Sequence, residues 1–281
     1  MVLNKKLIII LCCCFLMIGV FNIFVSAENQ YILSSETKED HVIVTTKHAE
    51  LYIKKGYINK DEINTIAQKI EIGIRDLKDY LGEYNKYNSS ELGKIEYYIQ
   101  DHHKINSSAI ISNGRVYLSH VHLKKSPYIH ETAHILLDKN AEEVPDPWLK
   151  EGLPTYLNAK FGQYKPNIIG DNNNLAKRTQ QYLQNEEYEV VLEYFPAPFN
   201  RGADERRAFY WLSASFIKFI EDNYGKEKLL KLYNAKRKEA FTISALEDNS
   251  NEDIEESSKS VEEILGTSLE ELKENWINSI N

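Results

Sequence analysis

The sequence predicts an α+β protein whose first half is rich in strands and whose second half is helical. Residues 41–46, 50–53 and 95–99 are rich in β-branched and aromatic side chains, which favour strands. After residue 127, apolar side chains recur instead at the three- and four-residue spacing of amphipathic helices. His130 and His134, one helical turn apart, lie at the start of this helical region. We therefore expect a mixed sheet and a helical subdomain on either side of a cleft.

The remaining elements follow from the same periodicities. Further strands are expected within residues 109–118, and helices at residues 174–183, 204–223, 226–236 and 268–280. Residues 247–259 are strongly acidic and are expected to form a solvated loop. A helix that ends before Gly82 is expected over residues 60–81, where these apolar residues share one face: Ile63, Ile66, Ile70, Ile74 and Leu77.

Asn113-Gly114 indicates a hairpin turn, because both residues tolerate the positive φ angles that short turns require. The alternating residues 115–118 are expected to form an edge strand along the cleft. A peptide could add to such an edge through main-chain hydrogen bonds. The alternative is an ordinary edge strand that binds no ligand. His120 and His122 continue the alternation, so we expect them to share one face of the strand. The pair His102-His103 lacks a carboxylate or cysteine at ligand spacing, and we expect it to be an ordinary polar position.

Three helix starts carry capping signals. Ser126-Pro127 and Asp146-Pro147 each combine an N-cap side chain with a proline suited to the first helical position. Ser268 and Glu271 have the spacing of a capping box. The first of these helices is expected to be buried on one side, because it has an apolar stripe of Ile129, Ala133, Leu136 and Leu137.

The pattern that carries chemistry is His130-Glu131-Thr132-Ala133-His134, which is H-E-x-x-H. At about 100° per residue the two imidazoles lie on nearly the same helix face and can bind one metal ion. Glu131 is rotated about a quarter-turn away, so it is placed to act on a water molecule rather than to bind the metal. Glu151, on the next predicted helix, supplies the carboxylate of a His2Glu site with one open position. We therefore expect one Zn²⁺ per chain.

Two neighbours of Glu151 affect this expectation. Gly152 would let its helix approach the histidine helix closely. Pro154 removes the backbone hydrogen bond to the carbonyl of Lys150, and a kink there would decide whether Glu151 points at the metal.

The chain resembles the gluzincin metallopeptidases, most closely the peptidase MA-like group that shares a catalytic core with thermolysin and the aminopeptidases. The resemblance covers about residue 113 to the end and implies a zincin-like fold. It rests on H-E-x-x-H at 130–134, on Trp148-Leu149-x-Glu151-Gly152-Leu153-x-x-Tyr156, on Tyr210 with Ser213, Ser215 and Phe216, on Tyr224-Gly225, on Leu265-Gly266-x-Ser268-Leu269-Glu270-Glu271-Leu272, and on Trp276.

The resemblance implies roles for five residues. His130, His134 and Glu151 would bind zinc, Glu131 would be the general base, and Tyr210 would donate a hydrogen bond to the oxyanion. Aminopeptidases of this superfamily carry an acidic residue ahead of the metal helix, but residues 113–119 contain none. We therefore expect an endopeptidase rather than an aminopeptidase.

The amino-terminal segment has the pattern of a secretory signal. Lys5 and Lys6 precede an apolar run from residue 7 to 25, and Val25-Ser26-Ala27 offers small residues for cleavage after Ala27. We expect residues 1–27 to be a signal peptide, with an uncleaved anchor of residues 7–27 at the outer face of the membrane as the alternative. All three cysteines, at positions 12–14, lie inside this run and form no disulfide or metal framework.

Residues 28–281 are expected to form one metallopeptidase domain, with a strand-rich part at 28–138 and a helical part at 139–281. The net charge of −8 disfavours nucleic acid as a partner. We expect a secreted monomer that hydrolyses a peptide or protein substrate. The alternative is a catalytically silent protein of the same fold that binds a partner at the cell surface.

Overall fold

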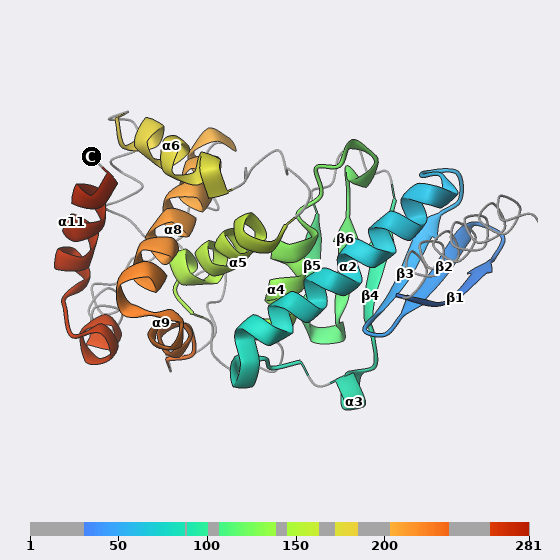
Figure 1. Cartoon of the computed structure of the whole chain (residues 1–281), viewed down its shortest axis with the longest axis horizontal. Helices are drawn as coiled ribbons and strands as arrows, with labels where there is room; N and C mark the ends of the chain where they lie inside the picture. The colour runs from blue at the N-terminus through green and yellow to red at the C-terminus, as the bar shows by residue number, and fades with distance from the viewer. Residues whose placement is uncertain are drawn as a thin grey trace, which may run out of the picture.

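The computed structural model describes residues 31–87, 89–100, 107–138, 145–162, 172–184, 203–235 and 259–280. Figure 1 shows a sheet towards one end of the molecule and the helices of the second half towards the other, so the expected α+β class is confirmed. Residues 1–27, His102-His103 and residues 247–258 lie outside the described residues. No described helix has both the length and the apolar content needed to cross a membrane.

Six strands form one mixed sheet in the order β1-β2-β3-β4-β6-β5. The pairs β1/β2, β2/β3 and β5/β6 are antiparallel, whereas β4 is parallel to both of its neighbours. Burial alternates along β3 and β4, so one face of the sheet is buried and the other is partly exposed. The strands are β1 (Ile32–Thr37), β2 (His41–Thr46), β3 (Ala49–Lys54), β4 (Ile95–Ile99), β5 (Ser108–Ile110) and β6 (Arg115–Leu118).

β6 is an interior strand, so the expectation that residues 115–118 form an edge was wrong. The chain turns through the 3-10 helix η2 (Ile111–Asn113) and Gly114, whose φ of 69° lies in the left-handed region. This turn folds β5 back onto β6, and β5 becomes the edge of the sheet. His120 and His122 do not share a strand face either. His120 has a φ of 58°, and His122 lies in the 3-10 helix η3 (Val121–Leu123).

α2 (Lys60–Leu81) has the expected bounds and packs against the sheet. A reciprocal capping box between Asn59 and Glu62 fixes its start, and Gly82, with a φ of 55°, fixes its end. The helix approaches the histidine helix, α4 (Tyr128–Asp138), very closely, because a Cβ on Gly73 would lie 2.5 Å from Cδ1 of Ile129.

α4 lies among α2, α5, β5 and β6. Because neighbours surround it, every residue from Tyr128 to Leu137 is buried, and the expectation of one-sided burial was wrong. Ser126 does not cap the helix with its side chain, since its hydroxyl is buried without a hydrogen-bond partner in the part of the chain that the structure describes. The hydroxyl of Tyr97 on β4 lies 2.6 Å from Oγ1 of Thr132, which ties this helix to the sheet.

α5 (Pro147–Phe161) packs against α8 (Ala203–Tyr224) at Gly152. A Cβ on Gly152 would lie 2.9 Å from Cβ of Ser213 and 3.1 Å from Cγ1 of Ile217. The expectation that Gly152 faces the histidine helix was therefore wrong, since it faces α8. Residues 259–265 are also helical. The other helices are η1 (Gly82–Tyr84), α3 (Ser89–Leu92), α6 (Asn172–Leu183), α9 (Lys226–Tyr233) and α11 (Leu269–Ile280).

Three neighbouring aromatic rings hold the helical half together. The ring of Trp148 on α5 lies 5.1 Å from that of Phe216 on α8, which lies 5.2 Å from that of Trp276 on α11. The indole Nε1 of Trp276 donates to the hydroxyl of Ser215 at 3.2 Å. At the start of α11, the amide of Glu271 donates to Oγ of Ser268, as one arm of the expected capping box.

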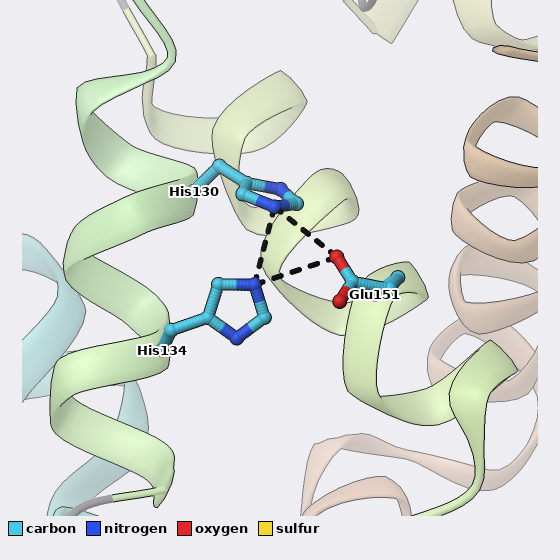
Figure 2. Close-up of side chains that lie close together, drawn as sticks. All are labelled: His130, His134 and Glu151. Carbon is cyan, nitrogen blue, oxygen red and sulfur yellow. Dashed lines mark hydrogen bonds and ion pairs between the residues drawn. The ribbon is translucent and has the colours of Figure 1, made fainter. Parts of the chain in front are cut away.

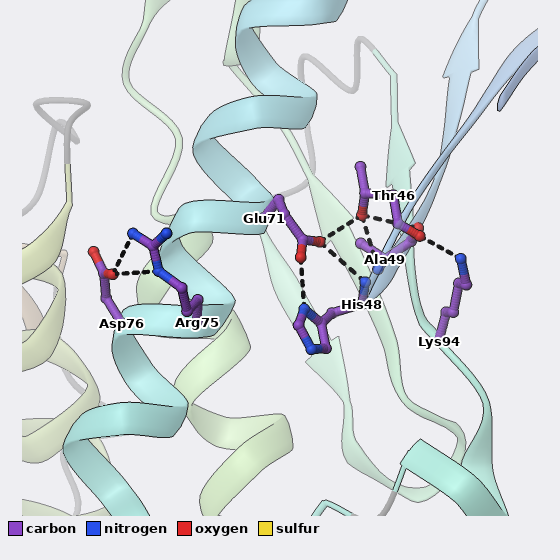
Figure 3. Close-up of polar contacts among 7 residues, drawn as sticks. All are labelled: Thr46, His48, Ala49, Glu71, Arg75, Asp76 and Lys94. Carbon is purple, nitrogen blue, oxygen red and sulfur yellow. Dashed lines mark hydrogen bonds and ion pairs between the residues drawn. The ribbon is translucent and has the colours of Figure 1, made fainter. Parts of the chain in front are cut away.

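A polar cluster ties α2 to the turn between β2 and β3 (Figure 3). Glu71, although buried, accepts hydrogen bonds at 2.7 Å from the hydroxyl of Thr46 and at 3.0 Å from the amide of His48. Its second oxygen lies 2.6 Å from Nδ1 of His48. Burial alone would raise the pKa of Glu71, but these hydrogen bonds outweigh burial and lower it below 4.5. The cluster therefore stabilises the fold more when Glu71 is ionised than when it is protonated.

Candidate metal centre

His130, His134 and Glu151 converge on one point between α4 and α5 (Figure 2). Nε2 of His130 and Nε2 of His134 are 3.2 Å apart, and Oε2 of Glu151 lies 3.4 Å from the first and 3.5 Å from the second. Ligand atoms about 2.1 Å from a tetrahedral metal ion lie about 3.4 Å from one another. The three side chains therefore have the spacing of three corners of a tetrahedral site.

All three side chains are buried, with exposed fractions of 7%, 7% and 9% for His130, His134 and Glu151. Among the residues that the structure describes, this is the one group of three or more His, Cys, Asp or Glu side chains whose ligand atoms lie within 4.8 Å of one another. Such a buried group can hold a metal ion.

Pro154 does not turn Glu151 away from the site. α5 runs from Pro147 to Phe161 with Pro154 inside it, and Glu151 faces both imidazoles. Asp146 occupies the expected N-cap position, but its carboxylate accepts from the indole of Trp148 at 3.2 Å instead of capping the helix. That indole is buried, so the start of α5 is anchored one turn before Glu151.

The outer nitrogen of each imidazole has a partner that the sequence analysis missed. Oδ2 of Asp138 lies 3.2 Å from Nδ1 of His134, and the other oxygen of Asp138 accepts from the hydroxyl of Tyr233 at 2.7 Å. Oγ1 of Thr155 lies 3.3 Å from Nδ1 of His130. A carboxylate can only accept, so Nδ1 of His134 carries a proton and Nε2 faces the site, where it can bind a metal ion when it is deprotonated. The hydroxyl of Thr155 can donate or accept, so it is compatible with the same tautomer of His130.

Two imidazole nitrogens that face each other at 3.2 Å repel through their lone pairs unless a proton or a metal ion lies between them. Burial would lower the pKa of His134, but the charge of Glu151 and the hydrogen bond to Asp138 outweigh burial and raise it from 6.5 to about 10. The imidazoles in turn lower the pKa of Glu151 in spite of its burial. The group thus has the electrostatic character of a cation site.

Glu131 and Tyr210 lie beside this group without belonging to it. Glu131 is buried, and burial raises its pKa above 4.5 against the opposing effect of the two histidines. The ring of Tyr210 on α8 lies 5.9 Å from the ring of His130. Burial and the charges of Glu151 and Glu131 raise the pKa of Tyr210, so its phenol remains a hydrogen-bond donor at neutral pH.

Three other residues of the resemblance, and His122, contact residues outside the metal group. Ser213 faces Gly152, and Ser215 accepts from Trp276. The hydroxyl of Tyr156 accepts from Lys160 at 3.3 Å. His122 lies 2.7 Å from the hydroxyl of Tyr57, away from the ligand atoms of the metal group.

No protein-family model matches the chain, and no curated protein matches its sequence. The geometry of the site therefore carries the functional conclusion.

Proposed function

We propose that the protein is a zinc-dependent endopeptidase with a zincin-like fold, secreted after removal of residues 1–27. The observation that supports the proposal most is the buried group of two imidazoles and one carboxylate at tetrahedral spacing. Both imidazoles have their outer nitrogens occupied by Asp138 and Thr155, as metal-bound histidines commonly do.

Zinc is the metal that best suits these ligands. Magnesium and calcium prefer sites made wholly of oxygen, whereas two of the three atoms here are imidazole nitrogens. Three protein ligands with one open corner are typical of catalytic zinc, whereas structural zinc sites take four protein ligands. A bound zinc ion would supply a Lewis acid that polarises a peptide carbonyl and makes water more acidic.

The remaining chemistry belongs to side chains of this protein. Glu131, whose pKa is raised by burial, accepts a proton from the attacking water and passes it to the departing amine. Tyr210 donates a hydrogen bond to the oxygen on which negative charge develops. Glu151 remains ionised throughout, because the neighbouring imidazoles lower its pKa. These roles rest on the positions of the three residues around the metal group.

The peptide is expected to lie along β5. This strand is the edge of the described sheet next to β6, and it lies against α4, which carries both histidines. An extended peptide can pair with the open edge of such a strand through its main chain. Peptide pairing, first expected at residues 115–118, is therefore proposed for Ser108–Ile110.

The test is cleavage of a mixed peptide library by the zinc-loaded protein, measured by mass spectrometry. The protein should cleave within peptides rather than trim their ends, and a chelator should stop it. Glu131→Gln should lower the rate by about 10²- to 10⁴-fold, because it removes the proton acceptor. Glu83→Gln, a matched change at an exposed glutamate, should leave the rate unchanged.

The zinc content of Glu131→Gln should equal that of the unchanged protein, because Glu131 does not belong to the metal group. If both proteins bind zinc and neither cleaves any peptide, the catalytic proposal is refuted and the silent binding protein is supported.

A further inference from the structure

One stripe of α8 runs along the metal group. Ile217 and Ser213 on this stripe pack against Gly152 of α5, next to the metal ligand Glu151. Tyr210 comes one turn earlier, with its ring 5.9 Å from that of His130. Arg206 is four residues before Tyr210, on the same face and about 6 Å along the helix axis. The stripe thus passes from the packed core, over the metal group, to Arg206.

Arg206 is exposed and pairs with no carboxylate in the part of the chain that the structure describes. Two other cations at this helix are paired, because Lys218 contacts Asp222 and Lys160 contacts Glu221. Arg206 precedes Tyr210 by one helical turn on the same face of α8, and the ring of Tyr210 lies 5.9 Å from that of His130. An exposed guanidinium with no carboxylate partner among the described residues therefore lies at the solvent end of the stripe that leads to the metal group.

The positive charge of Arg206 lies in otherwise negatively charged surroundings. The protein carries a net charge of −8, and the site beneath contains Glu131 and Glu151. The net negative charge of the protein disfavours the approach of an acidic peptide, and a local positive group that contacts the peptide carboxylate would offset this repulsion. A guanidinium suits that task, because it binds a carboxylate through two parallel hydrogen bonds.

We propose that Arg206 selects peptide substrates that carry a carboxylate close to the scissile bond. The selection rests on the proposed peptidase function, but the contact between Arg206 and the carboxylate does not require hydrolysis. The carboxylate comes either from an aspartate or glutamate side chain or from the carboxyl terminus of a short peptide.

The first test measures binding without hydrolysis. The probes are the hydroxamates of Nα-acetyl-glutamate and Nα-acetyl-glutamine, which anchor at the zinc ion and differ in one charge. The zinc-loaded Glu131→Gln protein should bind the glutamate probe about 5- to 20-fold more tightly. Adding Arg206→Gln should bring this ratio close to one, and Arg206→Lys should leave an intermediate ratio. Arg207→Gln, at the adjacent exposed arginine, should keep the full ratio.

The second test measures cleavage by the unchanged protein. Two pools of decapeptides differ only in a single Glu or Gln at each of the central positions, and each pool is made with free and with amidated carboxyl termini. The Glu pool should be cleaved faster, and Arg206→Gln should remove the difference. If peptides with free termini are instead cleaved faster than amidated ones in both pools, and Arg206→Gln removes that difference, the terminal carboxylate is the recognised group.

The two proposals fail in different ways. An Arg206-dependent binding ratio with no cleavage of any pool would refute the peptidase function and leave the role of Arg206 standing. Cleavage of both pools at equal rates, together with equal binding of the two hydroxamates, would overturn the role of Arg206 and leave the peptidase function standing.

Discussion

Asp138 lies one helical turn after His134 and is the carboxylate that holds its outer nitrogen, so Asp138→Asn should weaken metal binding. The amide oxygen that this change introduces can still accept from His134, and the new amino group can donate to the hydroxyl of Tyr233. The substitution therefore removes the negative charge and preserves the shape. Asp138→Ala removes both hydrogen bonds and leaves the buried Nδ1–H of His134 without an acceptor.

The magnitudes follow from the burial of this pair. The side chains of His134 and Asp138 are each only 9% exposed, so solvent screens their interaction little. A charge-assisted hydrogen bond is about twice as strong as a neutral one, so Asp138→Asn should cost about 1 kcal/mol, or about 5-fold in zinc affinity. Asp138→Ala should reach the 10- to 100-fold loss typical of partners that orient metal ligands. Tyr233→Phe, which removes only the donor to Asp138, should have the smallest effect.

The assay is competition for zinc between each variant and a chromogenic chelator at pH 7. Asp222→Asn is the matched control, because this exposed carboxylate on α8 pairs with Lys218 and lies outside the metal group. If Asp138→Ala binds zinc within about two-fold of the unchanged protein, then Asp138 does not support His134 and the reasoning is wrong.

Three further perturbations test the packing, the polar cluster and the oxyanion donor. Gly152→Ala should lower the free energy of unfolding by about 1–3 kcal/mol in urea denaturation, because the new Cβ would overlap Ser213. Adding Ser213→Gly should restore part of the loss, and no loss in the single variant would contradict the packing. The pKa of Glu71 is lowered in the folded protein, so its ionised form adds stability above about pH 4.5, and this contribution disappears as the pH falls through the lowered value. The difference in unfolding free energy between the unchanged protein and Glu71→Gln should therefore become smaller as the pH falls from 7 to 3. A difference that stays constant would contradict the stabilising role of ionised Glu71. Tyr210→Phe should lower kcat by about 10²-fold while zinc affinity stays unchanged, and equal kcat values would exclude Tyr210 as the oxyanion donor.

Periodicity and capping signals were enough to predict most of the fold. The bounds of α2 were correct because five apolar residues share one face and glycine follows at position 82. β1 was missed, because five of its six residues are exposed and its sequence shows no buried face. The position of the sheet edge was missed because the sequence signalled a hairpin but not which of its two strands would also pair with β4.

Some parts of the site could also be predicted from the sequence, and others could not. The convergence of His130 and His134 follows from helical spacing, and the contribution of Glu151 was suggested by its sequence context. Asp138 could have been found, because it lies four residues after His134 on the same helix face. Tyr233 gave no local signal, since it reaches Asp138 from a helix 95 residues later in the chain. Gly152 was assigned to the wrong neighbour, because the sequence shows that a residue is small enough for close packing but not which helix packs against it.

The central claim is that His130, His134 and Glu151 hold a single zinc ion. The most direct measurement is anomalous X-ray scattering at the zinc absorption edge from crystals of protein purified without added metal or chelator. We expect one strong anomalous peak per chain, within about 2.2 Å of Nε2 of both histidines and of a carboxylate oxygen of Glu151. The claim would be contradicted if the three side chains were well ordered but showed no anomalous peak, even in crystals to which zinc had been added. A zinc ion bound at another position instead would also contradict it.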